Sequence, residues 1–88
     1  MRILVVSNSA KRKIKAFIKK HPEFKTKLET IIANLLKDPF QVRLETHKLT
    51  GRLKNLYGAS ITYEYRLVFF FDNQCVYITN IGSHEEVY

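Results

Sequence analysis

The sequence predicts an α+β domain that runs strand, two helices, then three antiparallel strands. A short apolar run opens the chain, and two segments with apolar residues at helical spacing follow it. From Arg52 onward the apolar residues recur at every second position, as in strands. The two helices are joined tightly enough to form an αα-hairpin on one face of a mainly antiparallel, twisted sheet. The 88 residues leave room for one core, so residues 1–88 are expected to form a single domain.

The first strand and the first helix follow from the opening 20 residues. Residues 1–6 alternate too little for a half-exposed strand, so a short and well-buried strand is expected there. Ser7-Asn8-Ser9 then offers side chains that can cap a helix N-terminus. Lysines and arginines separate the apolar positions that follow, which predicts an amphipathic helix with a basic outer face and the apolar residues Ala10, Ile14, Phe17 and Ile18.

A second helix is expected after the interruption at His21-Pro22-Glu23. Proline in the first turn and a carboxylate beside it favour a helix N-terminus, where N–H groups lack partners. His21 is therefore interpreted as a residue of the helix boundary. The helix should end near Asp38-Pro39, and its apolar face carries Phe24, Leu28, Ile31, Ile32 and Leu35.

The second half of the chain predicts the strands. Residues 40–46 form a connector of uncertain structure, and residues 47–51 an ordered loop in which Gly51 permits a turn. Turns are expected at Tyr63-Glu64 and at residues 72–74. One apolar set alternates along the strands and should face the helices, namely Ala59, Ile61, Leu67, Phe69 and Phe71, and Val76 and Ile78 continue a last strand.

The charge balance indicates a polyanionic partner. Fifteen Lys and Arg against eight Asp and Glu give a net charge of +7, and eight of the fifteen lie between Lys11 and Lys27. Clustered positive charge is typical of nucleic-acid binders, although an acidic protein partner or a merely solvated basic helix face would show the same pattern. Three residues of the first helix are substrate-binding candidates: Lys11, Arg12 and Lys15.

Several kinds of protein are disfavoured. The single cysteine excludes an internal disulfide and a cysteine-based metal cage, and the three histidines are dispersed with no carboxylate at ligand spacing. No metal site or cofactor is therefore expected, and no phosphate-binding glycine loop is present. Residues 1–6 are too short for a signal peptide, and no apolar run nears the roughly 20 residues that span a bilayer. A cytoplasmic protein without membrane contact is the default.

Arg66 is the first candidate for chemistry. It lies in an otherwise apolar strand, out of phase with Leu67 and Phe69, so it should leave the opposite sheet face. A guanidinium there can bind phosphate oxygens in a bidentate manner and stabilise charge that develops on phosphorus. A surface arginine paired with Glu64 or Glu45 is the alternative.

Further groups surround Arg66 in the sequence. Glu64 could accept a proton from a ribose 2′-hydroxyl, or be a solvated turn carboxylate. His47 and His84 titrate near neutrality, and each stands close to a glycine-containing loop. Tyr65 and Tyr88 offer aromatic faces on which RNA bases can stack.

The pattern resembles the RelE/ParE superfamily of bacterial toxins. The resemblance rests on the loop His47-Lys48-Leu49-x-Gly51, the strand Glu64-Tyr65-Arg66-Leu67-Val68, and the end Gly82-Ser83-His84-Glu85-Glu86-Val87-Tyr88. Its closest match is the YafQ-like branch, whose members end in Gly-x-His-x-x-x-aromatic. The resemblance implies a RelE-like β-α-α-β-β-β fold and the toxin of a type II toxin–antitoxin pair, with an antitoxin as partner. It also implies inhibition of translation by a metal-independent endoribonuclease that cuts mRNA in the 30S A site by 2′-hydroxyl attack, without cofactor or small-molecule ligand.

The resemblance also assigns roles to residues. The implied catalytic residues are His47, Glu64, Arg66, His84 and Tyr88. The predicted substrate-binding residues are Lys48, Arg52, Lys54, Tyr65 and Asn80, together with Lys11, Arg12 and Lys15. Ser60 and Asn80 depart from the pattern, because the YafQ-like branch has a histidine and an arginine there. A gyrase-inhibiting toxin like ParE, or a degenerate toxin that only binds its antitoxin, therefore remains an alternative.

Overall fold

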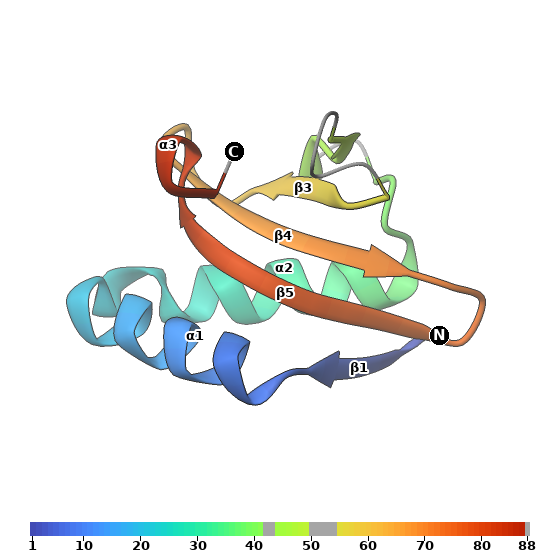
Figure 1. The fold of residues 1–88 in the computed structure, drawn as a ribbon, viewed down its shortest axis with the longest axis horizontal. Helices are drawn as coiled ribbons and strands as arrows, with labels where there is room; N and C mark the ends of the chain where they lie inside the picture. The colour runs from blue at the N-terminus through green and yellow to red at the C-terminus, as the bar shows by residue number, and fades with distance from the viewer. Residues whose placement is uncertain (42–43, 50–54, 88) are drawn as a thin grey trace.

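A computed structural model describes residues 1–41, 44–49 and 55–87 of the chain (Figure 1). The predicted α+β class and the order of its elements are confirmed. The elements are β1 (Ile3–Val6), α1 (Asn8–Lys20), the 3₁₀ turn η1 (Pro22–Phe24), α2 (Lys25–Lys37), β2 (His47–Lys48), β3 (Tyr57–Ser60), β4 (Tyr65–Phe71), β5 (Cys75–Ser83) and α3 (His84–Val87). Two of these differ from the prediction, because β2 lies in the expected loop and α3 lies beyond the last expected strand.

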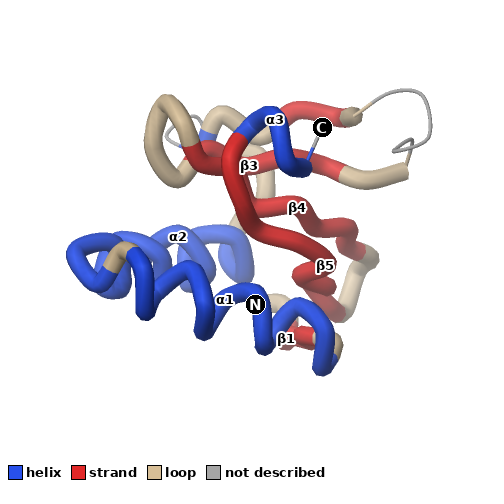
Figure 2. The backbone as a smooth tube through the Cα atoms, turned by 60° about the vertical axis from the view of Figure 1, so that its left-hand side comes forward, coloured by secondary structure: helices blue, strands red, loops and turns tan. Residues whose placement is uncertain are grey.

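The strands form one mixed sheet in the order β1-β5-β4-β3-β2. Only β1 pairs in parallel, with β5, and the other neighbours are antiparallel. The helices α1 and α2 lie side by side on one face of this sheet, whereas α3 lies at its end on the other side (Figures 1 and 2). The predicted αα-hairpin on one sheet face is therefore confirmed.

The helix ends follow the local sequence signals. The Ser7 hydroxyl accepts a hydrogen bond from the Ala10 amide at 3.1 Å, as an N-cap does. The His21 amide donates to the carbonyl of Phe17 at 2.8 Å and ends α1, so the predicted boundary role of His21 is confirmed. Of the described helices, none has the length and apolarity needed to cross a membrane.

The main core lies between the helices and the sheet. The predicted alternating set is buried there: Ala59, Leu67 and Phe69 are fully inaccessible, Ile61 is 2% exposed, and Phe71 packs against the same cluster. Each large side chain buried in this way contributes about 1.5–3 kcal/mol relative to an exposed one. Helix α2 supplies Leu28, Ile31 and Leu35 to the other side of this core.

A second, smaller cluster lies on the opposite sheet face. It joins Val68 of β4 to Val87 of α3 and to Leu49, which follows β2, with Leu56 packed beside them. The cluster therefore holds α3 and the chain around β2 on the face that the helices α1 and α2 leave open.

The prediction of a well-buried first strand was wrong. Residues 3–6 do form β1, but Ile3 is 67% exposed, Leu4 37% and Val5 40%. The reason is position in the sheet: β1 is an edge strand that pairs only with β5, and of its four residues only Val6 packs against the main core. An apolar run cannot by itself distinguish a central strand from an edge strand.

Candidate catalytic groove

Successive side chains of β4 point to opposite faces of the sheet, so one face carries core residues and the other carries the candidate site. Tyr65 and Leu67 face the helices, whereas Arg66 and Val68 face the open side of the sheet. Arg66 pairs with Ser60 of β3 and with Gly82 of β5. The guanidinium therefore leaves the strand on the predicted face, between two small neighbours.

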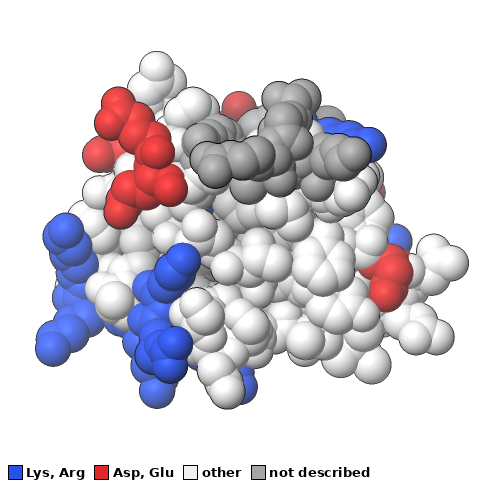
Figure 3. Space-filling view, in the orientation of Figure 1, with Lys and Arg blue, Asp and Glu red and all other residues white. Residues whose placement is uncertain are grey.

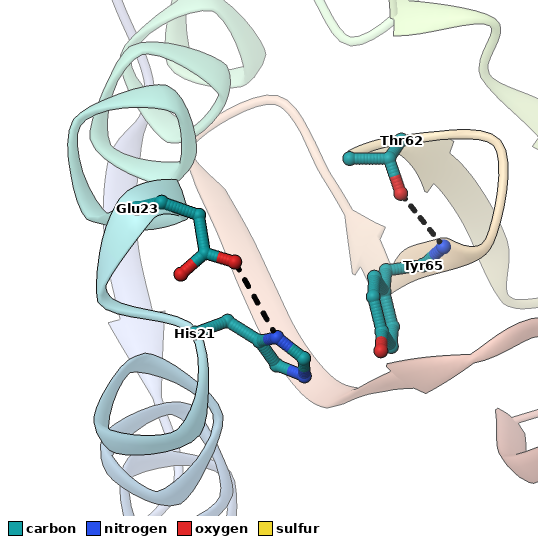
Figure 4. Close-up of polar contacts among 4 residues, drawn as sticks. All are labelled: His21, Glu23, Thr62 and Tyr65. Atoms are coloured by element: carbon teal, nitrogen blue, oxygen red, sulfur yellow. Dashed lines mark hydrogen bonds and ion pairs between the residues drawn. The ribbon is translucent and has the colours of Figure 1, made fainter.

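The turn before β4 holds Arg66 in place. Its Nη1 donates to the carbonyl oxygens of Thr62, Tyr63 (2.9 Å) and Tyr65 (3.1 Å). The Thr62 hydroxyl in turn accepts hydrogen bonds from the amides of Glu64 and Tyr65, each at 3.2 Å, and these bonds order the turn. Figure 4 shows the bond to Tyr65. Within the described chain, Nε and Nη2 of Arg66 make no hydrogen bond. A fixed arginine with two free nitrogens is suited to bidentate binding of a phosphate.

A capping box places His84. The Ser83 amide donates to Oε1 of Glu86 at 2.9 Å, and the Glu86 amide donates to Oγ of Ser83 at 3.2 Å. The hydrogen bonds that Ser83 donates to the Glu86 carboxylate, from its amide first, lower the pKa of that carboxyl because they stabilise its charged form. His84 is the first residue of α3, and its amide donates to the carbonyl of Glu64 at 2.9 Å. The sequence carries a signal for this arrangement, the Ser-x-x-Glu pattern that often starts a helix.

Gly82 permits the close packing of α3. A Cβ at this position would lie 3.2 Å from Cγ1 of Val87 and 3.4 Å from Cβ of Glu86. A side chain at residue 82 would therefore require Val87 or Glu86 of α3 to shift by a few tenths of an ångström.

These elements enclose a pocket of about 540 Å³, here called the Arg66 groove. Three predicted catalytic residues, Glu64, Arg66 and His84, line it together. The Glu64 side chain is exposed and forms neither an ion pair nor a hydrogen bond with any described residue. The remaining lining residues are Tyr63, Ser83 and Glu85. Arginine, carboxylate and imidazole side by side can bind a phosphate and transfer protons.

The backbone of His47 lies on β2, two strands away from β4. It pairs with Gly58, which pairs with Val68, two residues along β4 from Arg66. That separation corresponds to about 6–7 Å along a strand. Lys48 is exposed next to it. The predicted site residues Arg52, Lys54 and Tyr88 lie outside the described residues.

Two tyrosines lie elsewhere than the prediction expected. Tyr65, predicted to bind substrate, does not line the Arg66 groove, because its ring packs on the helix side at 4.9 Å from His21 and 5.1 Å from Phe17 (Figure 4). Burial first, and then the charges of Glu64 and Glu86, raise the pKa of its hydroxyl. Tyr63, which is not among the predicted site residues, is 95% exposed and lines the groove. The sequence did carry a signal for Tyr63, because a residue at a predicted turn is often exposed. The family resemblance instead pointed to Tyr65.

A second pocket, here called the helix-side pocket, lies between α1 and the end of β5. Its volume is about 620 Å³, and Lys13, Lys20, Tyr65, Asn80 and Glu86 are among its lining residues. Oδ1 of Asn80 accepts hydrogen bonds from Lys13 Nζ at 3.1 Å and from the Ile81 amide at 2.9 Å. In Figure 3 basic side chains gather below acidic ones at this end of the molecule. Two predicted substrate-binding residues, Tyr65 and Asn80, therefore lie here rather than in the Arg66 groove.

Other predicted residues lie apart from both pockets. Lys11, Arg12 and Lys15 are exposed on α1 and line neither pocket. In the described part of the chain, no three His, Cys, Asp or Glu side chains come close enough together to hold a metal ion.

Several solved structures share this fold. The structure of YafQ from E. coli strain BL21(DE3) superposes with a TM-score of 0.84 at 16% identity, over 100% of this chain and 99% of that chain. The toxin in the YoeB–YefM complex from Staphylococcus aureus gives 0.78 at 20% identity, over 96% and 98% of the two chains. The E. coli DinJ–YafQ complex gives 0.82 at 17% identity, over 99% and 97%. The fold is thus that of the RelE-like toxins.

The family follows from the sequence. The family model described as "Bacterial toxin of type II toxin-antitoxin system, YafQ" matches residues 2–88. This chain therefore belongs to the YafQ family of type II toxins, as the resemblance implied. Among curated proteins none matches the chain.

Proposed function

We propose that this toxin is an mRNA endoribonuclease that acts on the translating ribosome and needs no metal ion. One observation carries the proposal: Glu64, Arg66 and His84 share one groove, and Arg66 is held by the turn while its Nε and Nη2 bond to none of the described residues. Phosphoryl transfer needs electrostatic stabilisation and positioned proton transfer, and these residues supply both.

The chemistry is an attack within the RNA strand. One histidine, His84 or His47, removes the proton of a ribose 2′-hydroxyl, and the oxygen forms a bond to the adjacent phosphorus. The bond from phosphorus to the 5′-oxygen breaks, and the other histidine gives that oxygen a proton. Arg66 binds the non-bridging oxygens, whose charge grows in the transition state. Glu64 assists the proton transfer, and the products are a 2′,3′-cyclic phosphate and a free 5′-hydroxyl.

The remaining groups of the site hold the RNA. Tyr63 projects from the turn beside the groove, where an exposed ring can stack on a base. Tyr88, which lies outside the described residues, is a further catalytic residue by the family resemblance. These contacts hold the strand in line with the attacking hydroxyl.

Basic side chains outside the groove dock the toxin on RNA of the 30S A site, in the cytoplasm. Lys11, Arg12 and Lys15 on α1 and Lys48 on β2 are exposed cations. Arg52 and Lys54, which lie outside the described residues, are predicted to share this role. Binding through phosphates weakens steeply as salt rises.

The expected protein partner is an antitoxin. Relatives with this fold were solved as the DinJ–YafQ and YoeB–YefM complexes. A partner that carries acidic side chains would neutralise the basic surface of this chain, whose net charge is +7.

A translation reaction followed by primer extension tests the proposal. Wild-type toxin should produce new 5′ ends within the translated message, and His84→Ala should produce none. DNA supercoiling by gyrase is measured in parallel. Supercoiling inhibited by a toxin that never cuts mRNA would replace the nuclease by a ParE-like function, and antitoxin binding alone would indicate a degenerate toxin.

A further inference from the structure

We propose that the helix-side pocket is a second subsite for the RNA, which binds one nucleotide next to the cut when its base carries an exocyclic amine. The inference rests on the proposed nuclease function, because it assumes that RNA occupies the Arg66 groove. It concerns a different surface, built by α1 and the end of β5.

The helix-side pocket and the Arg66 groove share a rim. Glu64 and Ser83 line both of them. A strand whose phosphate lies on Arg66 and which continues past these two residues therefore enters the helix-side pocket. Its volume of about 620 Å³ lies within the roughly 300–1,000 Å³ of small-ligand sites.

One wall of the pocket is cationic. Lys13 and Lys20 reach it from α1, seven residues apart on that helix. Seven residues are about two helical turns, so both lysines lie on one face. Asn80 fixes the Lys13 ammonium through the hydrogen bond of 3.1 Å. These cations can bind the phosphate of the entering nucleotide.

The opposite wall of the pocket is anionic. Aromatic rings line the pocket between the cationic wall and the anionic wall. Glu64 and Glu86 line it from the turn and from α3, and both raise the pKa of the Tyr65 hydroxyl, after burial. The rings of Phe17, His21 and Tyr65 lie within 5.1 Å of one another, centre to centre. A simple anion would be repelled by the two carboxylates, and a simple cation by the two lysines.

A nucleotide satisfies both walls. Its phosphate suits Lys13 and Lys20, its base can stack on the rings, and an exocyclic amine can donate to a carboxylate. The Glu64 side chain has no hydrogen-bond partner among the described residues and lines both pockets, so one of its two carboxylate oxygens can accept such a bond while the other faces the Arg66 groove. Adenine, cytosine and guanine carry the amine. Uracil lacks it, and the ring N3–H, at a different position, is the only donor on its Watson–Crick edge.

The test measures single-turnover cleavage on ribosomes programmed with short mRNAs. Each nucleotide within two of the cut is replaced in turn by an abasic ribose or by uridine. The double variant Lys13→Gln/Lys20→Gln removes the cationic wall. The matched control, Lys19→Gln/Lys25→Gln, removes the same charge from exposed lysines that line neither pocket.

At one flanking position, the abasic and uridine messages should each be cut about tenfold more slowly by wild-type toxin and by the control. The variant Lys13→Gln/Lys20→Gln should cut every message slowly. Replacing the base at that position should lower its rate by less than a further threefold. Lys13→Arg/Lys20→Arg should restore the base dependence. Equal base dependence in the pocket and control variants overturns the subsite while leaving the nuclease function intact. A wild-type toxin that cuts no message overturns the proposed function, and the subsite with it.

Discussion

The ammonium of Lys13 lies 3.1 Å from Oδ1 of Asn80. Asn80 stands where the YafQ-like pattern carries an arginine, so the sequence suggested that a positive charge had been lost. The structure shows a cation at that asparagine, supplied by α1 from 67 residues away in the chain. The positive charge next to Asn80 therefore comes from Lys13, a residue too far away in the sequence for any local pattern to connect the two.

Arg66→Gln should lower the rate of mRNA cleavage by about 10²-fold or more, because one donor to a transition-state oxyanion contributes that much. The same change removes three hydrogen bonds to the turn, so some stability is lost as well. Single-turnover cleavage and thermal unfolding measure the two effects.

Thr62→Val is the control for Arg66, since it loosens the same turn by removing the hydroxyl that accepts two amides. It should lower the unfolding temperature but leave most of the activity. If Thr62→Val and Arg66→Gln lose the same activity, Arg66 acts only through the turn.

Tyr63→Ala should slow cleavage about tenfold, whereas Tyr63→Phe should stay near the wild-type rate. Stacking of a base on an aromatic ring contributes about 1–3 kcal/mol, and the ring without its hydroxyl retains it. Because the side chain is 95% exposed, neither change should alter the thermal unfolding temperature. Equal losses for both substitutions would rule out stacking.

Gly82→Ala should impair both folding and cleavage. The added Cβ would approach Val87 to 3.2 Å and displace α3, with a cost of about 1–3 kcal/mol as in other overpacked sites. Chemical denaturation measures the free energy of unfolding, and the programmed-ribosome assay measures the rate. Unchanged activity in a destabilised protein would show that the position of His84 relative to Arg66 is not critical.

The capping box of α3 should make stability depend on pH in the acid range. The pKa of Glu86 is lower in the folded state than in the unfolded chain, because Ser83 donates to its carboxylate. Its contribution is therefore complete above the unfolded pKa and disappears as pH falls through the folded pKa. The difference in unfolding temperature between wild type and Glu86→Gln should shrink from about pH 6 to about pH 3. A difference that stays constant over that range would assign the effect of Glu86 to something other than its charge.

Local signals carried most of the secondary structure. The cap at Ser7, the proline after His21 and the alternation from Leu67 to Phe71 each depend on neighbours a few residues away, and each prediction was confirmed. Alternation also predicted that Arg66 lies on the face opposite the core, since the direction of successive side chains in a strand is fixed by the backbone.

Reasoning from local signals failed where the burial of a residue depends on the position of its strand in the sheet. Whether Ile3 is covered depends on β1 being an edge strand, and that order is set by pairing with β5, over 70 residues away. The alternation that directs Arg66 to the open face also directs Tyr65 toward the helices. Tyr65 was nevertheless predicted to bind substrate, because the family resemblance pointed to an aromatic residue there.

The sequence by itself determined the fold class, the family, the two faces of β4 and the basic character of α1, because composition, periodicity and short motifs are properties of the chain alone. Only the tertiary structure decided which residues meet. It brought Glu64, Arg66 and His84 into one groove, placed Tyr63 there in place of Tyr65, and set Lys13 against Asn80. These contacts join elements far apart in the chain, and the packing of the whole sheet against its helices determines them.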